Sequence, residues 1–299
     1  MNELDDNIEG RPIDASLNIS QGYIIVKENI LKILLLSFTV SLVSFSFSFF
    51  FPDIYKSNAI LSPAESLQGN IQNEISSLSF LGVPFPNASS NKVDVALEKL
   101  KSLDFFKKLV NKHQLLPSLI AVNYWDKKTK SLIYDNSLFD SKSSEWLGET
   151  LSYQNAHKQF LKNLKTNISP LNGLVEISYE HLSPIEAKKW LELIIKEINL
   201  DLKQREIIKA QNSLEYLRKE AVKTSFVEVQ NAISKLSEEQ MKSIMLASTT
   251  EEFVFELVSS PYIAEKPFWP KRNLIFFLTL FSSFSFFCFF FILKKSFDL

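Results

Sequence analysis

The sequence predicts an α+β protein in which two transmembrane helices flank a water-soluble α/β base domain with a protruding hairpin of long helices. Three observations lead to this fold class. Two apolar runs without charged residues, 33–51 and 273–293, lie near the two ends and are 19 and 21 residues long. Between them, alternating segments typical of strands are mixed with amphipathic helical patterns. Finally, residues 185–260 contain neither glycine nor proline, which predicts a long helical region.

Both apolar runs are predicted to span a membrane. At about 1.5 Å per residue, each is long enough to cross roughly 30 Å of hydrocarbon. A buried helix of a soluble protein is the alternative, but such helices rarely stay uncharged over this length. A secretory signal peptide is another alternative for the first run, but its apolar stretch is longer than the usual apolar core of a signal peptide. No small-residue cleavage site follows it, since the chain continues Phe51-Pro52-Asp53. We therefore expect an anchor that stays attached.

The basic residues around the first span predict the orientation of the chain. Arg11, Lys27 and Lys32 precede this span, whereas Lys56 follows it; the second span has basic residues on both sides. Because the first helix usually dominates, both termini are expected in the cytoplasm and the central domain outside it. The expected parts are a cytoplasmic tail 1–32, transmembrane helix 33–51, extracytoplasmic domain 52–272, transmembrane helix 273–293 and cytoplasmic tail 294–299.

The central domain is almost neutral. It holds 28 Lys and Arg against 27 Asp and Glu with the signs interspersed, so it offers no electrostatic site for nucleic acid. The one cysteine, Cys288, lies in the second apolar run, so no disulfide is expected in the domain. Its stability must come from its own core and its partners.

The base is expected to begin with a strand at 54–61, whose residues alternate and are partly β-branched. Ser62-Pro63-Ala64-Glu65 then reads as a helix cap, which predicts a helix from Pro63. Asn91 is expected to cap a second helix that ends near His113. Further elements expected in the base are a short strand near 132–134, a helix from about 144 to 165, and strands at 173–179 and 252–258.

A second cap motif opens the long helical region. Ser183 is expected as the N-cap and Pro184 as the first helical residue, with Glu186 three residues after the cap and Ala187 next to it. One straight helix over 184–247 would be about 95 Å long, and the roughly 25 residues back to Asn273 reach only about 80 Å. The apolar phase also slips near 221–222. A helical arm over 184–247 with a turn near 223–225 is therefore expected, on a base made of 52–183 and 248–272.

No catalytic, cofactor-binding or metal-binding residues are predicted. The chain has no G-x-x-x-x-G-K-[ST] phosphate loop. His113, His157 and His181 lack the His-Glu-x-x-His spacing and are expected as helix-end or surface residues. The acidic pairs 238–239 and 251–252 are expected in solvent. Basic residues of the arm alternate with acidic ones, which favours a solvated face or ion pairs between subunits over a site for an anionic polymer.

Small residues within the spans predict close helix approach. The serines concerned are Ser37, Ser41, Ser44 and Ser48 in the first span and Ser282, Ser283 and Ser285 in the second. A proline-rich segment precedes the second span, where prolines fix the backbone, Trp269 suits the membrane interface and a basic pair meets the headgroups. The residues of this segment singled out as a site are Pro261, Pro267, Pro270, Lys271 and Arg272.

Four passages of the sequence resemble the chain length determinant family, the Wzz-type polysaccharide co-polymerases, in its short class without a kinase domain. They are the strand Tyr55 to Leu61, Ala96-Leu97-x-x-Leu100-x-Ser102-x-x-Phe105, the passage from Gly173 to Tyr179 leading through Ser183-Pro184-x-x-Ala187, and Lys266-Pro267-x-x-Pro270-Lys271-Arg272. The chain departs from the family pattern in having fewer prolines in the last motif, no glycine in the second span and a short projection.

The resemblance implies a non-enzymatic regulator of the bacterial inner membrane with a periplasmic domain. Such proteins form homo-oligomers and set the chain length of O-antigen or a related lipopolysaccharide polymer together with the inner-membrane polymerase. The implied partners are further copies of the chain, the polymerase, the nascent polysaccharide and membrane lipid. An export adaptor for capsule or exopolysaccharide has the same membrane architecture and remains the alternative. A two-span sensor is a third reading, which would need a cytoplasmic signalling domain beyond the short tail 294–299.

Overall fold

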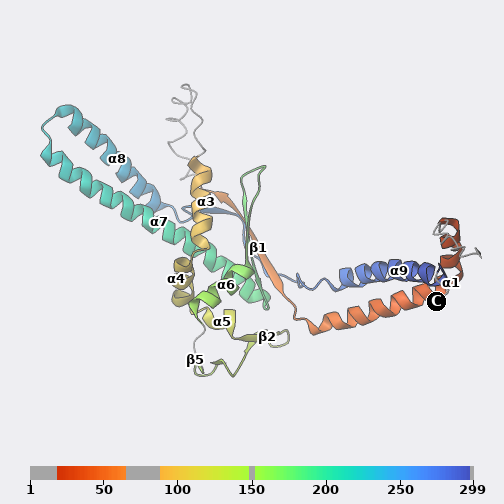
Figure 1. Ribbon diagram of the computed structural model, residues 1–299. Helices are drawn as coiled ribbons and strands as arrows, with labels where there is room; N and C mark the ends of the chain where they lie inside the picture. Colours follow the sequence, from red (N-terminus) through yellow and green to blue (C-terminus); the bar gives the residue numbers. More distant parts are fainter. Residues whose placement is uncertain (1–18, 65–87, 148–151, 297–299) are drawn as a thin grey trace, which may run out of the picture. The chain divides into compact units, whose positions relative to one another are not determined.

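The computed structural model describes residues 19–64, 88–147 and 152–296 (Figure 1). The chain divides into two compact units. Unit 1 comprises Met1–Pro52 and Trp269–Leu299, and unit 2 comprises Asp53–Phe268. Helices and strands are mixed, and the α+β class predicted from the sequence is confirmed. Most of the expected N-terminal tail lies outside the described residues.

Unit 1 consists of helix α1 (Ile19–Phe47), the short 3₁₀ helix η1 (Ser48–Phe50) and helix α9 (Arg272–Ser296). Gly22–Phe50 and Arg272–Lys295 are long and apolar enough to cross a membrane. α1 therefore begins well before residue 33, where the predicted span starts. The last residues of the expected cytoplasmic tail form the first turns of this helix.

Serines join α1 to α9. Ser41 Oγ donates a hydrogen bond to the Phe276 carbonyl at 2.9 Å, and Ser283 Oγ donates to the Ser37 carbonyl at 3.4 Å. Ser37 and Ser41 are fully buried. Small side chains let the two helix backbones approach, and their hydroxyls bond across the interface where lipid offers no partner. Three of the serines predicted to pack the spans, Ser37, Ser41 and Ser283, therefore do so.

Unit 2 is built on an antiparallel sheet of strand order β6-β7-β1-β8. The central strand β1 pairs with β7 from Tyr55 opposite His181 to Leu61 opposite Val175. It pairs with β8 only over its last residues, 60–63. Side chains of β1 alternate between buried and more exposed, so one face of the sheet is covered. The strands are β1 (Tyr55–Pro63), β6 (Leu164–Ile168), β7 (Val175–His181) and β8 (Phe255–Ser259).

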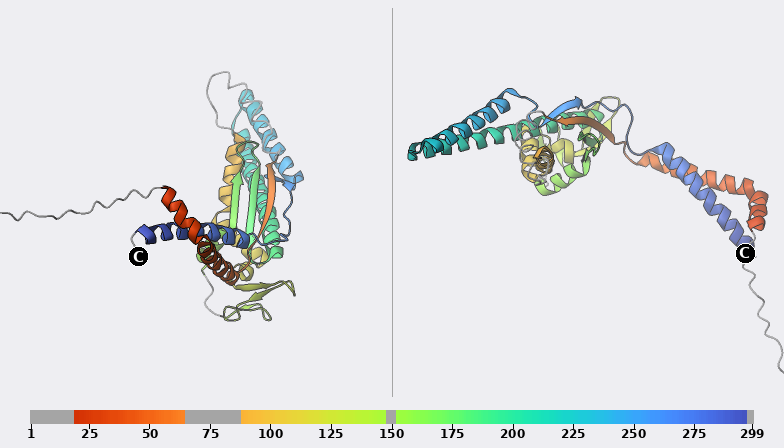
Figure 2. Two further views of the ribbon diagram at one scale, coloured as in Figure 1. Left: turned by 90° about the vertical axis from the view of Figure 1, so that its right-hand side faces the viewer. Right: turned by 90° about the horizontal axis from the view of Figure 1, so that it is seen from above.

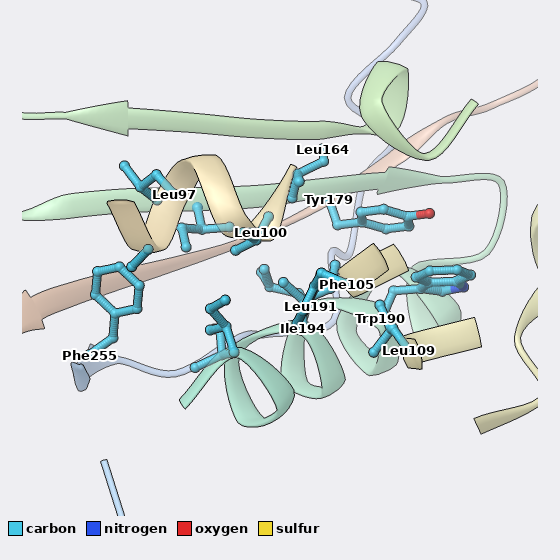
Figure 3. Packing of buried hydrophobic residues seen from close by; sticks show 14 of the residues in the cluster. Leu97, Leu100, Phe105, Leu109, Leu164, Tyr179, Trp190, Leu191, Ile194 and Phe255 are labelled. Carbon is cyan, nitrogen blue, oxygen red and sulfur yellow. The ribbon is translucent and has the colours of Figure 1, made fainter. Parts of the chain in front are cut away.

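Helices pack together with this sheet around one core (Figure 2). They are α3 (Ala88–Leu100), α4 (Leu103–His113), α5 (Leu116–Ile120), α6 (Tyr153–Asn163) and the first half of α7 (Pro184–Lys223). In the core, the Trp190 ring stacks on Tyr179 with centroids 5.0 Å apart (Figure 3). Leu191 and Ile194 follow on the same face of α7 and are fully buried. Each buried side chain of this size contributes about 1.5–3 kcal/mol to stability.

Two small hairpins complete unit 2. They are formed by β2 (Val122–Asp126) with β3 (Ser131–Tyr134), and by β4 (Phe139–Asp140) with β5 (Glu145–Trp146). The expected strand near 132–134 is confirmed. The helix expected over 144–165 is wrong at both ends: Ser152 caps α6, and Leu164 is already extended because it pairs with Tyr179 of β7.

Two other predicted helices also need correction. Pro63 does not start a helix but ends β1 opposite Phe255, and the Ala64 amide donates to the Val254 carbonyl at 2.9 Å. The rest of that expected helix lies outside the described residues. The single helix expected to end at His113 is two helices, because Ser102 has extended backbone angles and caps α4 by accepting from the Phe105 amide.

The long helical region forms the predicted hairpin, hereafter the arm. α7 has 40 residues and α8 (Val227–Thr249) has 23, and they lie side by side with their turn at residues 224–226 (Figure 1). α7 starts where Tyr55 pairs with His181, whereas α8 leads into β8 at the other end of β1. At about 1.5 Å per residue α7 is roughly 60 Å long, against about 30 Å for β1. The arm therefore extends beyond the end of the sheet opposite to residue 54.

Candidate functional site at the chain connections of the base

The two chain connections of unit 2 lie side by side. The Phe268 amide donates to the Ile54 carbonyl at 2.8 Å, and Ser57 Oγ donates to the Tyr262 carbonyl at 2.8 Å. Lys56 Nζ lies 5.2 Å from the centre of the Phe268 ring. The segment after β8 thus returns along the first half of β1, where β8 does not pair. Its prolines lack an amide hydrogen, so a regular strand ladder cannot form there.

The predicted proline-rich site is divided between the two units. Pro261 is buried and Pro267 half-buried in unit 2, whereas Pro270 is buried in unit 1 and is preceded by a cis peptide bond. Lys271 is exposed, and the Arg272 guanidinium lies 4.8 Å from the centre of the Phe49 ring. In the same unit the rings of Phe51 and Trp269 are 5.5 Å apart. Aromatic and cationic side chains therefore gather where α1 ends and α9 begins, as suits a membrane interface.

The start of α7 lies at the same end of the sheet. Ser183 Oγ accepts from the Glu186 amide at 3.3 Å, Pro184 is in the first turn, and Ala187 is fully buried. The Glu186 carboxylate does not bond back to the Ser183 amide, as a complete capping box would require. It pairs with Lys189 at 3.3 Å instead.

His181 takes the place of that carboxylate. The Ser183 amide donates to His181 Nδ1 at 3.0 Å, and His181 Nε2 lies 2.8 Å from the Ser118 carbonyl. Because Nδ1 accepts, Nε2 carries the hydrogen and the ring is neutral. Burial lowers the pKa of His181. Trp190 Nε1 donates to Ser118 Oγ at 3.1 Å and extends the network into the core. The expectation of a helix-end or surface residue is therefore wrong for His181, which closes β7 onto α5 and α7.

Ion pairs fasten α4 to α7. Lys112 Nζ and His113 Nε2 both contact Glu197 Oε1, at 2.8 and 3.0 Å, and Lys108 Nζ lies 2.7 Å from Asp201 Oδ1. Burial alone would raise the pKa of Glu197, but its bonds to Lys112 and His113 outweigh burial and lower the pKa. Burial alone would also raise the pKa of Asp201. The hydrogen bond from Lys108 and the nearby basic groups outweigh burial, so the pKa is lowered.

Asn199 is a polar residue of structural importance that the sequence pattern does not reveal. It lies on the buried face of α7, and its Oδ1 accepts from the amides of Val254 and Phe255 at 2.8 and 3.0 Å. Its Nδ2 donates to the Phe255 carbonyl at 3.0 Å. One side chain thus satisfies three backbone groups where the chain leaves the arm and enters β8.

A hollow of about 500 Å³ opens among α5, α6 and β7. Asn155, Gln159 and Asn163 of α6, each four residues apart, contribute amide groups to its wall, and Gln159 Nε2 donates to Asn163 Oδ1 at 3.3 Å. Amides both donate and accept hydrogen bonds, which suits a hydroxyl-rich ligand. Among the described residues, no group of three His, Cys, Asp or Glu is placed to hold a metal ion.

Comparisons with known proteins bear on the whole chain. No family model and no curated protein matches it. It is similar to the solved structure of a full-length bacterial polysaccharide co-polymerase, with 12% identity over 91% of this chain and 96% of that chain and a TM-score of 0.35. It is also similar to a fragment of WzzB, a polysaccharide co-polymerase from Salmonella Typhimurium, with 14% identity over 73% of this chain and 100% of that chain and a TM-score of 0.28.

Proposed function

We propose that this chain is a non-enzymatic regulator of polysaccharide chain length in a bacterial inner membrane. In this proposal both termini are cytoplasmic and unit 2 is periplasmic. The regulated polymer is O-antigen or a related lipopolysaccharide polymer, and the chain acts as an oligomeric scaffold beside the polymerase. The observation that carries the proposal is a base whose two chain connections meet at Ile54 and Phe268, with a two-helix arm extending from the opposite end.

This architecture suits side-by-side assembly. A domain tethered at both ends to one membrane shares its orientation with every other copy, so copies can associate around an axis normal to the bilayer. The arm is a pair of helices with exposed apolar side chains that it cannot bury by itself, among them Tyr216, Phe226 and Met245. In the proposal the arm and the base helices make the contacts between copies, and the spans with the proline-rich segment contact the polymerase.

The hollow beside α6 is the place that we assign to the nascent polysaccharide. Its amides at residues 155, 159 and 163 match the alternating donors and acceptors of sugar hydroxyls. Ile54, the residue bonded to Phe268, belongs to its lining. The hollow therefore lies beside the chain connections of unit 2.

The proposal is tested by the length distribution of surface polysaccharide on a gel, from native cells with and without this chain. The chain is re-expressed unchanged, with Pro267→Ala and Pro270→Ala together, or with Pro170→Ala as a control in the exposed turn after β6. We expect that loss of the chain turns a clustered length distribution into a random one. The unchanged chain and the control should restore the cluster, and the double proline variant should restore it poorly.

The export-adaptor alternative predicts a different outcome. If the chain serves export, its loss removes polymer from the cell surface while the lengths that remain are unchanged. That result would overturn the proposal of chain-length control.

A further inference from the structure

A basic turn is fixed next to the start of β1. The turn between β2 and β3 has the sequence Asp126-Lys127-Lys128-Thr129-Lys130. Lys127 Nζ lies 2.7 Å from Asp53 Oδ2. Asp53 follows Phe51, the last residue of the first predicted span, by two residues. Two residues of extended chain reach about 7 Å. The turn is therefore held within a short distance of the point where the chain leaves the membrane.

The turn is built to keep its cations in solvent. The Asp126 carboxylate accepts from the Lys128 amide at 2.9 Å and from Thr129 Oγ1 at 2.8 Å, so this acid is engaged in shaping the turn. Lys130 has a positive φ of 51°, which closes the turn. Lys127, Lys128 and Lys130 are exposed. The turn thus carries three lysines and one aspartate, which leaves an excess of positive charge. Of the three lysines, Lys127 is the one that pairs with Asp53.

The tethering of unit 2 creates a need for such a surface. Because the Phe268 amide bonds to the Ile54 carbonyl, the two chain connections are neighbours and act almost as a single point of attachment. A body attached at one point can tilt about it. A second contact with the bilayer, displaced from the connections, would restrict that tilt.

We propose that Lys128 and Lys130 of the β2–β3 turn bind anionic phospholipid headgroups and so form this second contact. A lysine near an anionic leaflet gains about 1 kcal/mol, and the attraction falls off within a Debye length. The ion pair between Lys127 and Asp53 keeps the turn close enough to the bilayer surface for this attraction to act. The proposal shares with the proposed function only the membrane anchoring of the chain and is independent of any role in polysaccharide length.

The test uses the full chain in nanodiscs of phosphatidylcholine alone and of an equal mixture of phosphatidylcholine and phosphatidylglycerol. The rate of lysine acetylation is measured by mass spectrometry at each site. The anionic lipid should slow acetylation of Lys128 and Lys130 by about fivefold, the factor that corresponds to roughly 1 kcal/mol per lysine. Lys235 of the arm should be unaffected, and high salt should remove the protection.

Charge-removing variants separate this contact from general effects of the lipid. Lys128→Gln should reduce the protection of Lys130, whereas Lys142→Gln in the neighbouring β4–β5 hairpin should leave it unchanged. Free inorganic phosphate added to phosphatidylcholine discs should not protect either lysine, which distinguishes a headgroup surface from a site for a single anion. Equal acetylation rates in both nanodiscs would overturn the proposal, even if polysaccharide length responds to the chain as proposed above.

Discussion

Asn199 and His181 are the residues whose side chains hold the ends of the helical arm in place. Each bonds to backbone groups that lie far away along the chain: Asn199 to Val254 and Phe255, and His181 to Ser118. Sequence patterns report neighbours at fixed short spacing, so a polar residue on an apolar helix face predicts nothing about such partners. The start of α7 at Pro184 was predictable, because its cap bond joins residues only three apart.

Replacing Asn199 with Ala should destabilise unit 2. The amides of Val254 and Phe255 would lose their acceptor while buried, at a cost of about 1–3 kcal/mol each. We expect a lower urea midpoint for the full chain in detergent, followed by tryptophan fluorescence, to which the buried Trp190 contributes. The exposed Asn212→Ala on the same helix should stay within about 0.5 kcal/mol of the unchanged chain. Equal midpoints for the two variants would contradict the bridging role of Asn199.

His181 should make the stability of unit 2 depend on pH. The unfolded chain takes up its proton near the ordinary pKa of 6.5, whereas burial lowers the pKa in the folded state. The unfolded state therefore binds more protons below pH 6.5, and stability should fall as the pH decreases, by at most about 1.4 kcal/mol per pH unit. Two charged groups nearby also act on the pKa of His181 in the folded state: the negative charge of Glu186 raises it, and the positive charge of Lys189 lowers it further.

The pH effect is measured from urea midpoints between pH 7.5 and the onset of carboxylate titration. His181→Asn keeps an acceptor for the Ser183 amide but cannot titrate. This variant should be less stable at neutral pH and show a flatter dependence below pH 6.5. The same slope in both proteins would show that another group is responsible.

At the scale of elements, local signals predicted the strands and the arm but not where some helices begin. Ser62-Pro63-Ala64-Glu65 carries the same cap signal as the start of α7, yet Pro63 lies in β1 because β8 supplies a pairing partner. The helix expected from 144 likewise gives way at Leu164 to pairing with Tyr179. In both cases a tertiary hydrogen-bond partner overrides a local preference. The arm, whose helices are neighbours in sequence, was predictable from phase and length.

The packing of α1 against α9 should depend on Ser41. A larger side chain at this fully buried position would separate the helices and remove the bond to the Phe276 carbonyl. A cysteine pair at Gly22 and Ile292 reports the distance, since a Cβ at Gly22 would lie 3.5 Å from Ile292 Cδ1. In a Cys288→Ser background, Ser41→Leu should lower disulfide formation by this pair several-fold.

Ser46→Leu serves as the matched change on the exposed side of α1. It should leave the disulfide yield unchanged. A similar yield in the Ser41 and Ser46 variants would contradict the serine-mediated packing.

The hollow beside α6 should influence polymer length if it contacts the glycan. Asn155→Ala with Gln159→Ala removes two of its amides from positions on the helix surface, so folding should be little affected. We expect a shifted or broadened cluster of lengths on a gel of surface polysaccharide. Gln154→Ala, on the same helix but outside the lining of the hollow, is the control. An unchanged distribution in the double variant would remove the hollow from the proposed function.

At the scale of the whole molecule, unit 2 is a base closed at its two chain connections, with an arm at the other end. Composition, apolar runs and the long glycine-free region predicted these parts. The pairing of Ile54 with Phe268 was beyond sequence reasoning, because it joins opposite ends of unit 2. This pairing turns two tethers into one narrow attachment of unit 2.

The central claim is that this chain controls how polymer lengths are distributed. The most direct measurement is a gel of surface polysaccharide from native cells that lack the chain and re-express it at graded levels. We expect a cluster of lengths to emerge from a random distribution as expression rises, while total surface polymer stays constant. Surface polymer that rises in proportion to expression with an unchanged length distribution would contradict it.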